Sequence, residues 1–271
     1  MVNVPEKLSE CWHNVGERRP LVYHVTNSVA AQFQADLTLA VGGSPIMSPA
    51  ADEAAELAKV ADAVLVNIGT PTDSSIDTIH AAMRSATQFG TPILLDPVGY
   101  GATAKRVALV DELLRLYPVA VIKGNAAEIA FMADRTEPPR GVDASESVGR
   151  SNDAAFWLAR KYETVVAVTG EADYVSDGKR VFEIRGGNAM IGRITAGGCG
   201  VGSLIAAILG ASGDSLASVL AGLIAMGQAS EMAVGAGPGT FRASLLDQLY
   251  GLAQTGLGSI EERLSLQDRI V

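Results

Sequence analysis

Short apolar runs rich in Val, Ile and Leu alternate with segments of helical periodicity along most of the 271-residue chain. Each short run is typical of a buried β-strand. The predicted strands are Leu21–Val25, Ala63–Ile68, Pro92–Asp96, Val119–Ile122 and Thr164–Thr169. Because strands that alternate with helices form βαβ units, we expect an α/β fold with a mainly parallel central sheet and helices on both faces.

The segments between these strands repeat their apolar residues with a period of about 3.6, as amphipathic helices do. The predicted apolar helix faces are Val29, Phe33, Leu37 and Ala40; Ile76, Ile79 and Met83; and Val107, Val110 and Leu114. The Thr-Asn-Ser sequence at 26–28 supplies cap candidates for the first helix. Gly42, Gly90 and Pro118 end the three helices in turn.

The pattern changes after Thr169. Ala172–Ser176 and Arg180–Ile184 flank an Asp-Gly pair and predict a β-hairpin. Three long helical patterns follow, beginning near Cys199, Ser215 and Thr240. The acidic stretch Glu137–Ser151 is interpreted as a surface loop, because the alternation of strands and helices resumes after it. We therefore predict a single domain over residues 1–271.

The chain carries 30 acidic and 21 basic residues, a net charge of -9. This balance argues against nucleic acid or an anionic membrane as the main partner, because both require a basic face. The two cysteines make no disulfide framework, and Met1–Pro20 lacks the apolar core of a secretory signal. The longest apolar stretch, Val201–Leu209, is too short to span a bilayer. We expect a cytoplasmic protein.

Polar or glycine-rich residues follow all five predicted strands, and the carboxyl ends of parallel strands are where α/β proteins bind ligands. Asp96 and Glu128 are the best-placed carboxylates for Mg²⁺, which takes one or two carboxylates together with water and phosphate oxygens. Lys123, just past a buried strand, is expected to face the phosphates. The alternatives are that Asp96 caps a turn, Glu128 favours a helix dipole, and Lys123 is solvated.

The sequence Thr-Ala-Gly-Gly-Cys-Gly at 195–200 precedes a predicted helix. Glycines let the backbone approach a ligand, and unpaired N–H groups at a helix start attract anions such as a transferred phosphoryl group. The alternative is a tight turn or close helix packing. Cys199 can have a lowered pKa there and act as a base or hydrogen-bond partner, or it can be buried and inert. His13 and His80 lack partners at ligand spacing, and His24 suits the core as well as a site.

Taken in order, these segments resemble the hydroxyethylthiazole kinase family of thiamin salvage, within the ribokinase-like superfamily. The matching stretches are 20–27, 42–47, 95–103, 123–129, 169–178, the cysteine turn and 237–241. The Ser-Pro-Ile-Met block at 44–47 and the cysteine are specific to this family, because most ribokinase-like relatives carry Asp at that position. The resemblance implies ATP-dependent phosphorylation of the hydroxyl of 4-methyl-5-(2-hydroxyethyl)thiazole, which gives the thiazole phosphate for thiamin synthesis.

The resemblance also implies roles for individual residues. The thiazole alcohol would contact Met47, Asn27, Ala196 and Gly198; ATP would contact Lys123, Thr169 and Asn125; and Mg²⁺ would lie at Asp96 and Glu128. Cys199 would sit beside the substrate hydroxyl, where relatives place a general base. Family members assemble as homotrimers with the thiazole site between subunits, which would suit the apolar Ile46-Met47 loop.

Some positions depart from the family pattern. Ala196 and Gly197 replace the Gly and Thr of the family's turn, Tyr23 stands where His is common, and Asp36 where Asn is common. Three alternative functions stay open. They are a kinase for a hydroxymethylpyrimidine or pyridoxal-type alcohol, which usually has Asp in the turn; a nucleotide-dependent dehydratase on the same fold; and a non-catalytic thiazole-binding protein.

Overall fold

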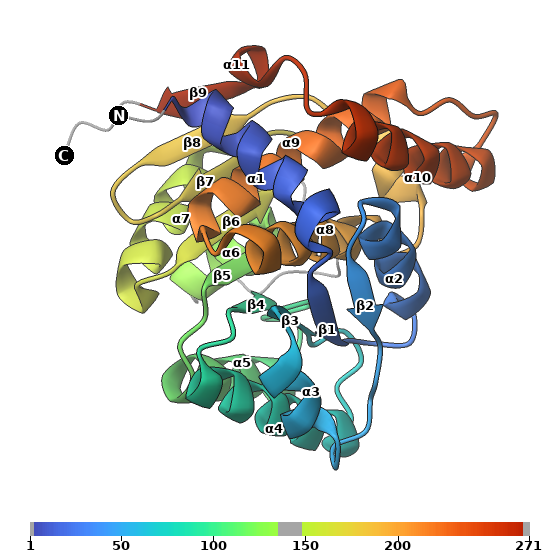
Figure 1. The fold of residues 1–271 in the computed structure, drawn as a ribbon. Coiled ribbons are helices and arrows are strands. Elements are labelled where there is room, and N and C mark those ends of the chain that lie inside the picture. Colours follow the sequence, from blue (N-terminus) through green and yellow to red (C-terminus); the bar gives the residue numbers. More distant parts are fainter. Residues whose placement is uncertain (1–2, 135–147, 268–271) are drawn as a thin grey trace.

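The computed structural model describes residues 3–134 and 148–267, and within them nine strands form one sheet (Figure 1). The strands are β1 (Leu21–Val25), β2 (Ser44–Ile46), β3 (Ala63–Asn67), β4 (Ile93–Asp96), β5 (Val121–Asn125), β6 (Val165–Thr169), β7 (Asp173–Ser176), β8 (Val181–Ile184) and β9 (Leu264–Gln267). Their order is β2-β1-β3-β4-β5-β6-β7-β8-β9. In this order, neighbouring strands from β2 through β1 to β6 pair in parallel, whereas β7, β8 and β9 are added antiparallel. The predicted mainly parallel sheet and the hairpin are therefore confirmed.

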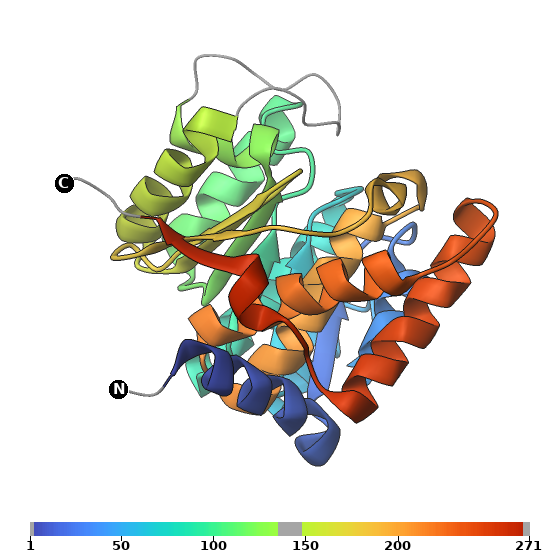
Figure 2. The same ribbon diagram turned by 90° about the horizontal axis from the view of Figure 1, so that it is seen from above.

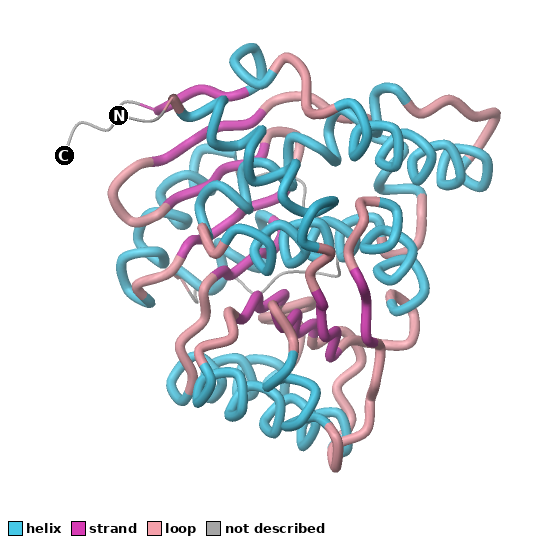
Figure 3. Tube along the Cα trace, viewed as in Figure 1, coloured by secondary structure: helices cyan, strands magenta, loops and turns pink. Residues whose placement is uncertain are grey.

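Helices cover both faces of the sheet, as predicted, and Figures 1 and 2 show the two layers. One face carries α1 (Val4–Arg18), α2 (Ala31–Ala40), α8 (Gly197–Ser212), α9 (Ser215–Met232) and α10 (Pro238–Thr255). The other carries α3 (Ala54–Val60), α4 (Asp73–Phe89), α5 (Ala104–Leu116), α6 (Ala126–Ala133) and α7 (Val148–Tyr162). Strand side chains alternate between the two cores: Val22 packs under α8, and Tyr23 packs on the opposite side. Figure 3 shows in pink the loops that join the helices and strands. Two short helices complete the list of elements: η1 (Ala189–Arg193) and α11 (Ile260–Arg263).

Among the strands that were predicted, β5 differs most from its predicted bounds. It covers Val121–Asn125 rather than Val119–Ile122, so Lys123 lies inside the strand and not after it. Backbone pairing with β6 explains the extension, because Lys123 pairs with Ala167 and Asn125 with Thr169. Polar side chains do not interrupt a ladder of backbone hydrogen bonds. A strand can therefore extend beyond the run of apolar residues from which it was predicted.

Several other elements differ from the sequence expectation. Helix α1 was not predicted, although Leu8, Cys11, Trp12 and Val15 follow helical spacing and are all buried. Val29 was predicted on a buried face but is 60% exposed, because α2 begins only at Ala31. Of the predicted loop at 137–151, residues 137–147 lie outside the described residues, and α7 already begins at 148.

Helix α8 lies close to both the sheet and its neighbouring helices, and glycines make this approach possible. A Cβ at Gly200 would overlap the Leu37 side chain on α2, and one at Gly202 would lie 3.2 Å from Leu65 Cδ1 on β3. On the far side, a Cβ at Gly222 of α9 would lie 2.7 Å from Ile205 Cγ1. Part of the glycine content of this region therefore serves packing, which was the alternative interpretation.

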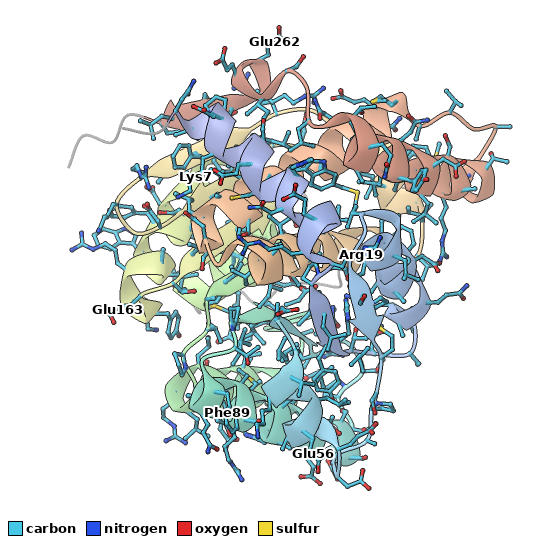
Figure 4. All side chains as sticks on the ribbon, viewed as in Figure 1. Lys7, Arg19, Glu56, Phe89, Glu163 and Glu262 are labelled. Atoms are coloured by element: carbon cyan, nitrogen blue, oxygen red, sulfur yellow. The ribbon has the colours of Figure 1, made fainter. Side chains whose placement is uncertain are left out.

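Most charged side chains lie on the surface, and the five charged residues that Figure 4 labels, Lys7, Arg19, Glu56, Glu163 and Glu262, are all exposed. Both cysteines are free, as predicted. Among the residues that the structure describes, no helix has the length and apolar character needed to cross a membrane.

Candidate active site

Five parallel strands end at the same edge of the sheet and bring polar residues together there. In register, Asn67 at the end of β3 pairs with Asp96 at the end of β4. Asn125 at the end of β5 likewise pairs with Thr169 at the end of β6. Asn27 follows β1 and donates through Nδ2 to Asn67 Oδ1 at 2.8 Å. The predicted convergence of strand ends is thus present in the structure.

A buried ion pair lies at the centre of this edge. Lys123 and Asp96 are 3% and 1% exposed, and Lys123 Nζ lies 3.0 Å from Asp96 Oδ2. Lys123 Nζ also donates to the carbonyl oxygen of Gly198 at 2.9 Å. Burial alone would lower the pKa of Lys123, but neighbouring negative charges, Asp96 foremost, outweigh burial and leave that pKa raised. Lys123 is therefore protonated and links the sheet to the glycine-rich turn through its contacts with Asp96 and Gly198, and it is not a solvated charge.

Asn67 is a site residue that the sequence analysis missed. Its Nδ2 donates to Asp96 Oδ2 at 2.9 Å, and its Oδ1 accepts from Asn27 Nδ2 and from the Gly69 N–H at 3.0 Å. The side chain is 3% exposed. One signal was available: Asn67 is the only polar residue in the run Ala63–Ile68, and a buried amide needs partners.

Glu128 is held by backbone donors. Its Oε1 accepts from the Gly99 N–H at 2.7 Å and its Oε2 from the Asn125 N–H at 2.8 Å. Asn125 Oδ1 in turn accepts from the Glu128 N–H, so the two residues form a capping box at the start of α6. Burial, reinforced by the charge of Asp96, raises the pKa of Glu128 to about 7. Glu128 therefore has a structural role in the first turn of α6, the place in a helix where the alternative interpretation put it. It also lies within electrostatic reach of Asp96.

The glycine-rich turn forms the start of α8, with Ala196 as its N-cap at φ 63° and ψ 16°. The Gly200 N–H bonds the Ala196 carbonyl at 2.8 Å, and the Gly197 N–H bonds the Ile194 carbonyl at 3.2 Å. Within the described residues, no hydrogen bond engages the N–H groups of Gly198 and Cys199. These two amides are thus available at the positive end of the helix dipole, as an anion requires.

Cys199 is half-buried in this first turn. Burial and then the charge of Asp96 raise the pKa of its thiol, and the opposing effects of Lys123 and an Asn67 hydrogen bond do not compensate. The expectation of a lowered pKa is therefore wrong, because the helix start is desolvated and lies beside a carboxylate. The Cys199 carbonyl accepts from Gln34 Nε2 at 3.1 Å. Gln34 is fully buried, and its Oε1 has no partner among the described residues.

A small cavity of about 170 Å³ opens beside Asn27 and Asn67. Its lining is Val25, Thr26, Asn27, Ser28, Asn67, Ile68, Thr70, Pro71, Thr72, Ser75 and Ile79. The Thr26 hydroxyl is buried there without a hydrogen-bond partner in the described part of the chain. Met47 does not line this cavity; it follows the edge strand β2 and is half-buried. The structure thus groups Asn27 with Asp96 through Asn67, but it leaves Met47 apart.

The remaining predicted residues and the histidines are readily placed. Thr169 Oγ1 donates to the Gly124 carbonyl at 3.3 Å, at the β5–β6 end of the site. His24 is a core residue: its Nδ1 lies 3.1 Å from the Val22 carbonyl and its Nε2 lies 3.2 Å from Ser203 Oγ. Burial lowers the pKa of His24 to about 4. His24 is therefore neutral near pH 7 and supports the packing of α8 on β1.

A parallel sheet edge with a buried lysine–aspartate pair beneath a glycine-rich helix start defines the class of this protein as an α/β phosphotransferase. The chain belongs to the hydroxyethylthiazole kinase family, whose sequence profile matches residues 12–255. This finding confirms the family and the enzyme class predicted from the sequence.

Individual relatives agree with this assignment. The chain is 43% identical over 247 residues to hydroxyethylthiazole kinase of Klebsiella pneumoniae (strain 342), covering 91% of this chain and 96% of the relative. It is 37% identical over 254 residues to that of Moorella thermoacetica (strain ATCC 39073 / JCM 9320), covering 93% and 95%. The solved hydroxyethylthiazole kinase structure from Pyrococcus horikoshii OT3 superposes with a TM-score of 0.85 at 34% identity, covering 97% of this chain and all of that one.

A more distant structure shows the fold alone. Pyridoxal kinase from Staphylococcus aureus, solved with AMP-PCP and pyridoxal, matches with a TM-score of 0.56 at 12% identity. The predicted ribokinase-like fold is confirmed by these two structural similarities together.

Proposed function

We propose that this chain transfers the γ-phosphoryl group of ATP to the primary hydroxyl of 4-methyl-5-(2-hydroxyethyl)thiazole. The observation that carries the proposal is the contact of Lys123 with both Asp96 and the Gly198 carbonyl. It joins a carboxylate at the strand ends to a helix start whose free N–H groups suit a phosphoryl group. Family membership supplies the alcohol acceptor.

Catalysis in this site rests on positioning and electrostatics. The N–H groups of Gly198 and Cys199 stabilise the oxygens of the transferred phosphoryl group. Lys123 holds the turn against the sheet and supplies positive charge beneath it. Since the pKa of Cys199 is raised, its thiol orients the substrate hydroxyl by hydrogen bonding. Ala196 and Gly198 border the hydroxyl from the turn.

The residues present fit Mg²⁺. Within the described residues, the carboxylate of Asp96 accepts hydrogen bonds only through Oδ2, which leaves Oδ1 open to a hard cation, and Glu128 lies within electrostatic reach. No group of three or more His, Cys, Asp or Glu side chains converges in that part of the chain. A cation held here would take its other ligands from water and phosphate. When bound, Mg²⁺ neutralises phosphate charge.

The two substrates are assigned to opposite sides of the turn. We assign ATP to the ends of β5 and β6, where Lys123, Asn125 and Thr169 lie. The alcohol belongs on the side of Asn27 and Met47. A homotrimer that brings the Met47 loop of one subunit to the cavity of another explains why Met47 lies apart within one chain. Val29 and Leu39, each 60% exposed on this side, suit such an interface.

Two further predictions stand as proposals. The chain acts as a single domain, because one sheet runs from β2 to β9 and its helices share two cores. It works in the cytoplasm, and two free cysteines suit a reducing compartment.

Product analysis tests the function. Purified protein is incubated with ATP, Mg²⁺ and a panel of thiazole, pyrimidine and pyridine alcohols, and product masses are recorded. We expect a phosphorylated hydroxyethylthiazole as the main product. A phosphorylated pyridoxal-type alcohol, or ATP consumption that restores a hydrated dinucleotide, would replace the proposal. A Cys199→Ala variant that keeps full turnover would remove the role given to Cys199.

A further inference from the structure

A chain of hydrogen bonds with one direction crosses the site. The N–H groups of Val29 and Ala30 donate to Asn27 Oδ1 at 3.0 and 3.1 Å. Asn27 Nδ2 donates to Asn67 Oδ1 at 2.8 Å, and Asn67 Nδ2 donates to Asp96 Oδ2 at 2.9 Å. Lys123 Nζ reaches the same Asp96 oxygen at 3.0 Å. The chain thus runs from the cavity beside β1 to the ion pair beneath α8.

The orientation of the Asn67 amide in this chain is fixed by its partners. The Asp96 carboxylate can only accept, so it requires the Nδ2 side of the amide. Asn27 Nδ2 and the Gly69 N–H both donate, so they require the Oδ1 side. Rotating the amide by half a turn would break all three hydrogen bonds and set two oxygens against each other.

Asn67 also lines the 170 Å³ cavity, and among the described residues of that lining its side chain is the one that donates to the Asp96 carboxylate, whereas Ile68 reaches only the Asp96 backbone carbonyl. Asp96 receives two donors on Oδ2, from Asn67 and Lys123, and these fix the rotation of its carboxylate. Without Asn67, a single donor would hold that carboxylate. The position of Oδ1, where phosphoryl transfer needs it, depends on both donors.

We propose that Asn67 is a positioning residue with two separable functions. Its donor side holds the Asp96 carboxylate in place for phosphoryl transfer, and its acceptor side holds the amide of Asn27 in place for the alcohol. This inference rests on the proposed function. It assigns to the strand end of β3 the link between the acceptor cavity and the transfer site.

Two substitutions separate these functions. Asn67→Asp keeps an oxygen for Asn27 and Gly69 but cannot donate to Asp96 when ionised. We expect its kcat to fall about 10–100-fold, while the KM for the alcohol stays within about twofold. Asn67→Leu removes both sides at similar size, so we expect a similar fall in kcat together with a rise in KM. If Asn67→Leu does not fold, Asn67→Ser replaces it, because Ser is too short to reach both partners.

A matched control separates positioning from folding. Gln228 on α9 is another buried amide, and it bonds both the carbonyl and the N–H of Gly258, away from the strand ends. Gln228→Leu should lower the thermal midpoint comparably but leave kcat and KM unchanged. If the Asn67 variants behave like Gln228→Leu, with only their thermal midpoints lowered, the proposal is overturned.

Binding without turnover keeps the proposed function and this inference distinguishable. Calorimetric titration of the alcohol should give near-normal affinity for Asn67→Asp and weakened affinity for Asn67→Leu. Equal affinity in both variants and wild type would overturn the acceptor-side function. If the wild-type protein binds the alcohol but forms no phosphorylated product, the proposed function fails. The pattern of affinities would still decide whether Asn67 positions Asn27.

Discussion

Three consecutive residues of the glycine-rich turn should respond to small substitutions with changes in stability of different sign. Ala196 has φ 63°, in the left-handed region, which costs an L-residue about 1–2 kcal/mol. Replacing it with Gly removes this strain but adds unfolded-chain freedom worth about 0.4–1 kcal/mol. The difference predicts that Ala196→Gly stabilises the protein by about 0.5–1 kcal/mol.

The next two glycines provide the comparison. A Cβ at Gly197 would overlap the carbonyl oxygen of Ile191, which belongs to the backbone and cannot rotate away. Gly197→Ala should therefore cost about 1–3 kcal/mol. A Cβ at Gly198 would meet no described atom within 4 Å, so Gly198→Ala should stabilise the first turn of α8 by up to about 1 kcal/mol.

Urea denaturation followed by circular dichroism measures all three variants against the wild type, with unchanged m-values as the check on comparability. The expected order of midpoints is Gly197→Ala below wild type, with Ala196→Gly and Gly198→Ala above it. A midpoint for Ala196→Gly clearly below that of the wild type would refute the strain argument. A Gly197→Ala variant with an unchanged midpoint would show that the segment from η1 to the start of α8 shifts to make room for the added Cβ.

Two other predictions concern buried charge. Lys123→Met should destabilise the protein by about 3–5 kcal/mol, because it leaves Asp96 buried without its cation. In denaturant titrations, the double variant Lys123→Met/Asp96→Asn should recover most of that loss. A double variant as unstable as Lys123→Met would contradict the pairing. The pKa of His24 falls from 6.5 in the unfolded chain to about 4 in the fold. Between these pH values the unfolded chain binds a proton on His24 that the folded protein does not. The free energy of unfolding therefore falls as the pH drops from 6.5 to 4, by up to about 3 kcal/mol. Unfolding free energies measured at pH 7, 5.5 and 4.5 should therefore decline more steeply in the wild type than in His24→Gln, and equal slopes would exclude His24 as the cause.

Local patterns predicted most of the parallel sheet, because buried strands in α/β folds are nearly pure apolar runs. The exception is β5, where the polarity of Lys123 concealed the end of the strand. Asn67 was included in the predicted strand Ala63–Ile68, and only its place in the candidate site was missed. The edge strands β2 and β9 were missed because neither is an apolar run: β2 reads Ser-Pro-Ile and β9 reads Leu-Ser-Leu-Gln.

The candidate site was predicted in part of its membership but not in its connections, because Asn67 was missed and Met47 lies apart. Asp96, Lys123 and the cysteine turn were expected to converge, and they do. The direction of each hydrogen bond, and the raised rather than lowered pKa of Cys199, depend on burial and on neighbours distant in sequence. No spacing rule encodes these, since Lys123 and Gly198 are 75 residues apart.

Helix α8 joins two parts of the molecule that should differ greatly in hydrogen exchange. From Gly200 to Leu209 it is almost entirely buried between α1, α2, α9 and the sheet, whereas Thr195 and Gly198 at its start are exposed. Amides in the buried part can meet deuterium only when the whole fold opens, while those of the turn exchange from the native state. If the proposed anion site is correct, binding would order only a short exposed turn at the start of a helix that is already rigid, and little conformational entropy would be lost.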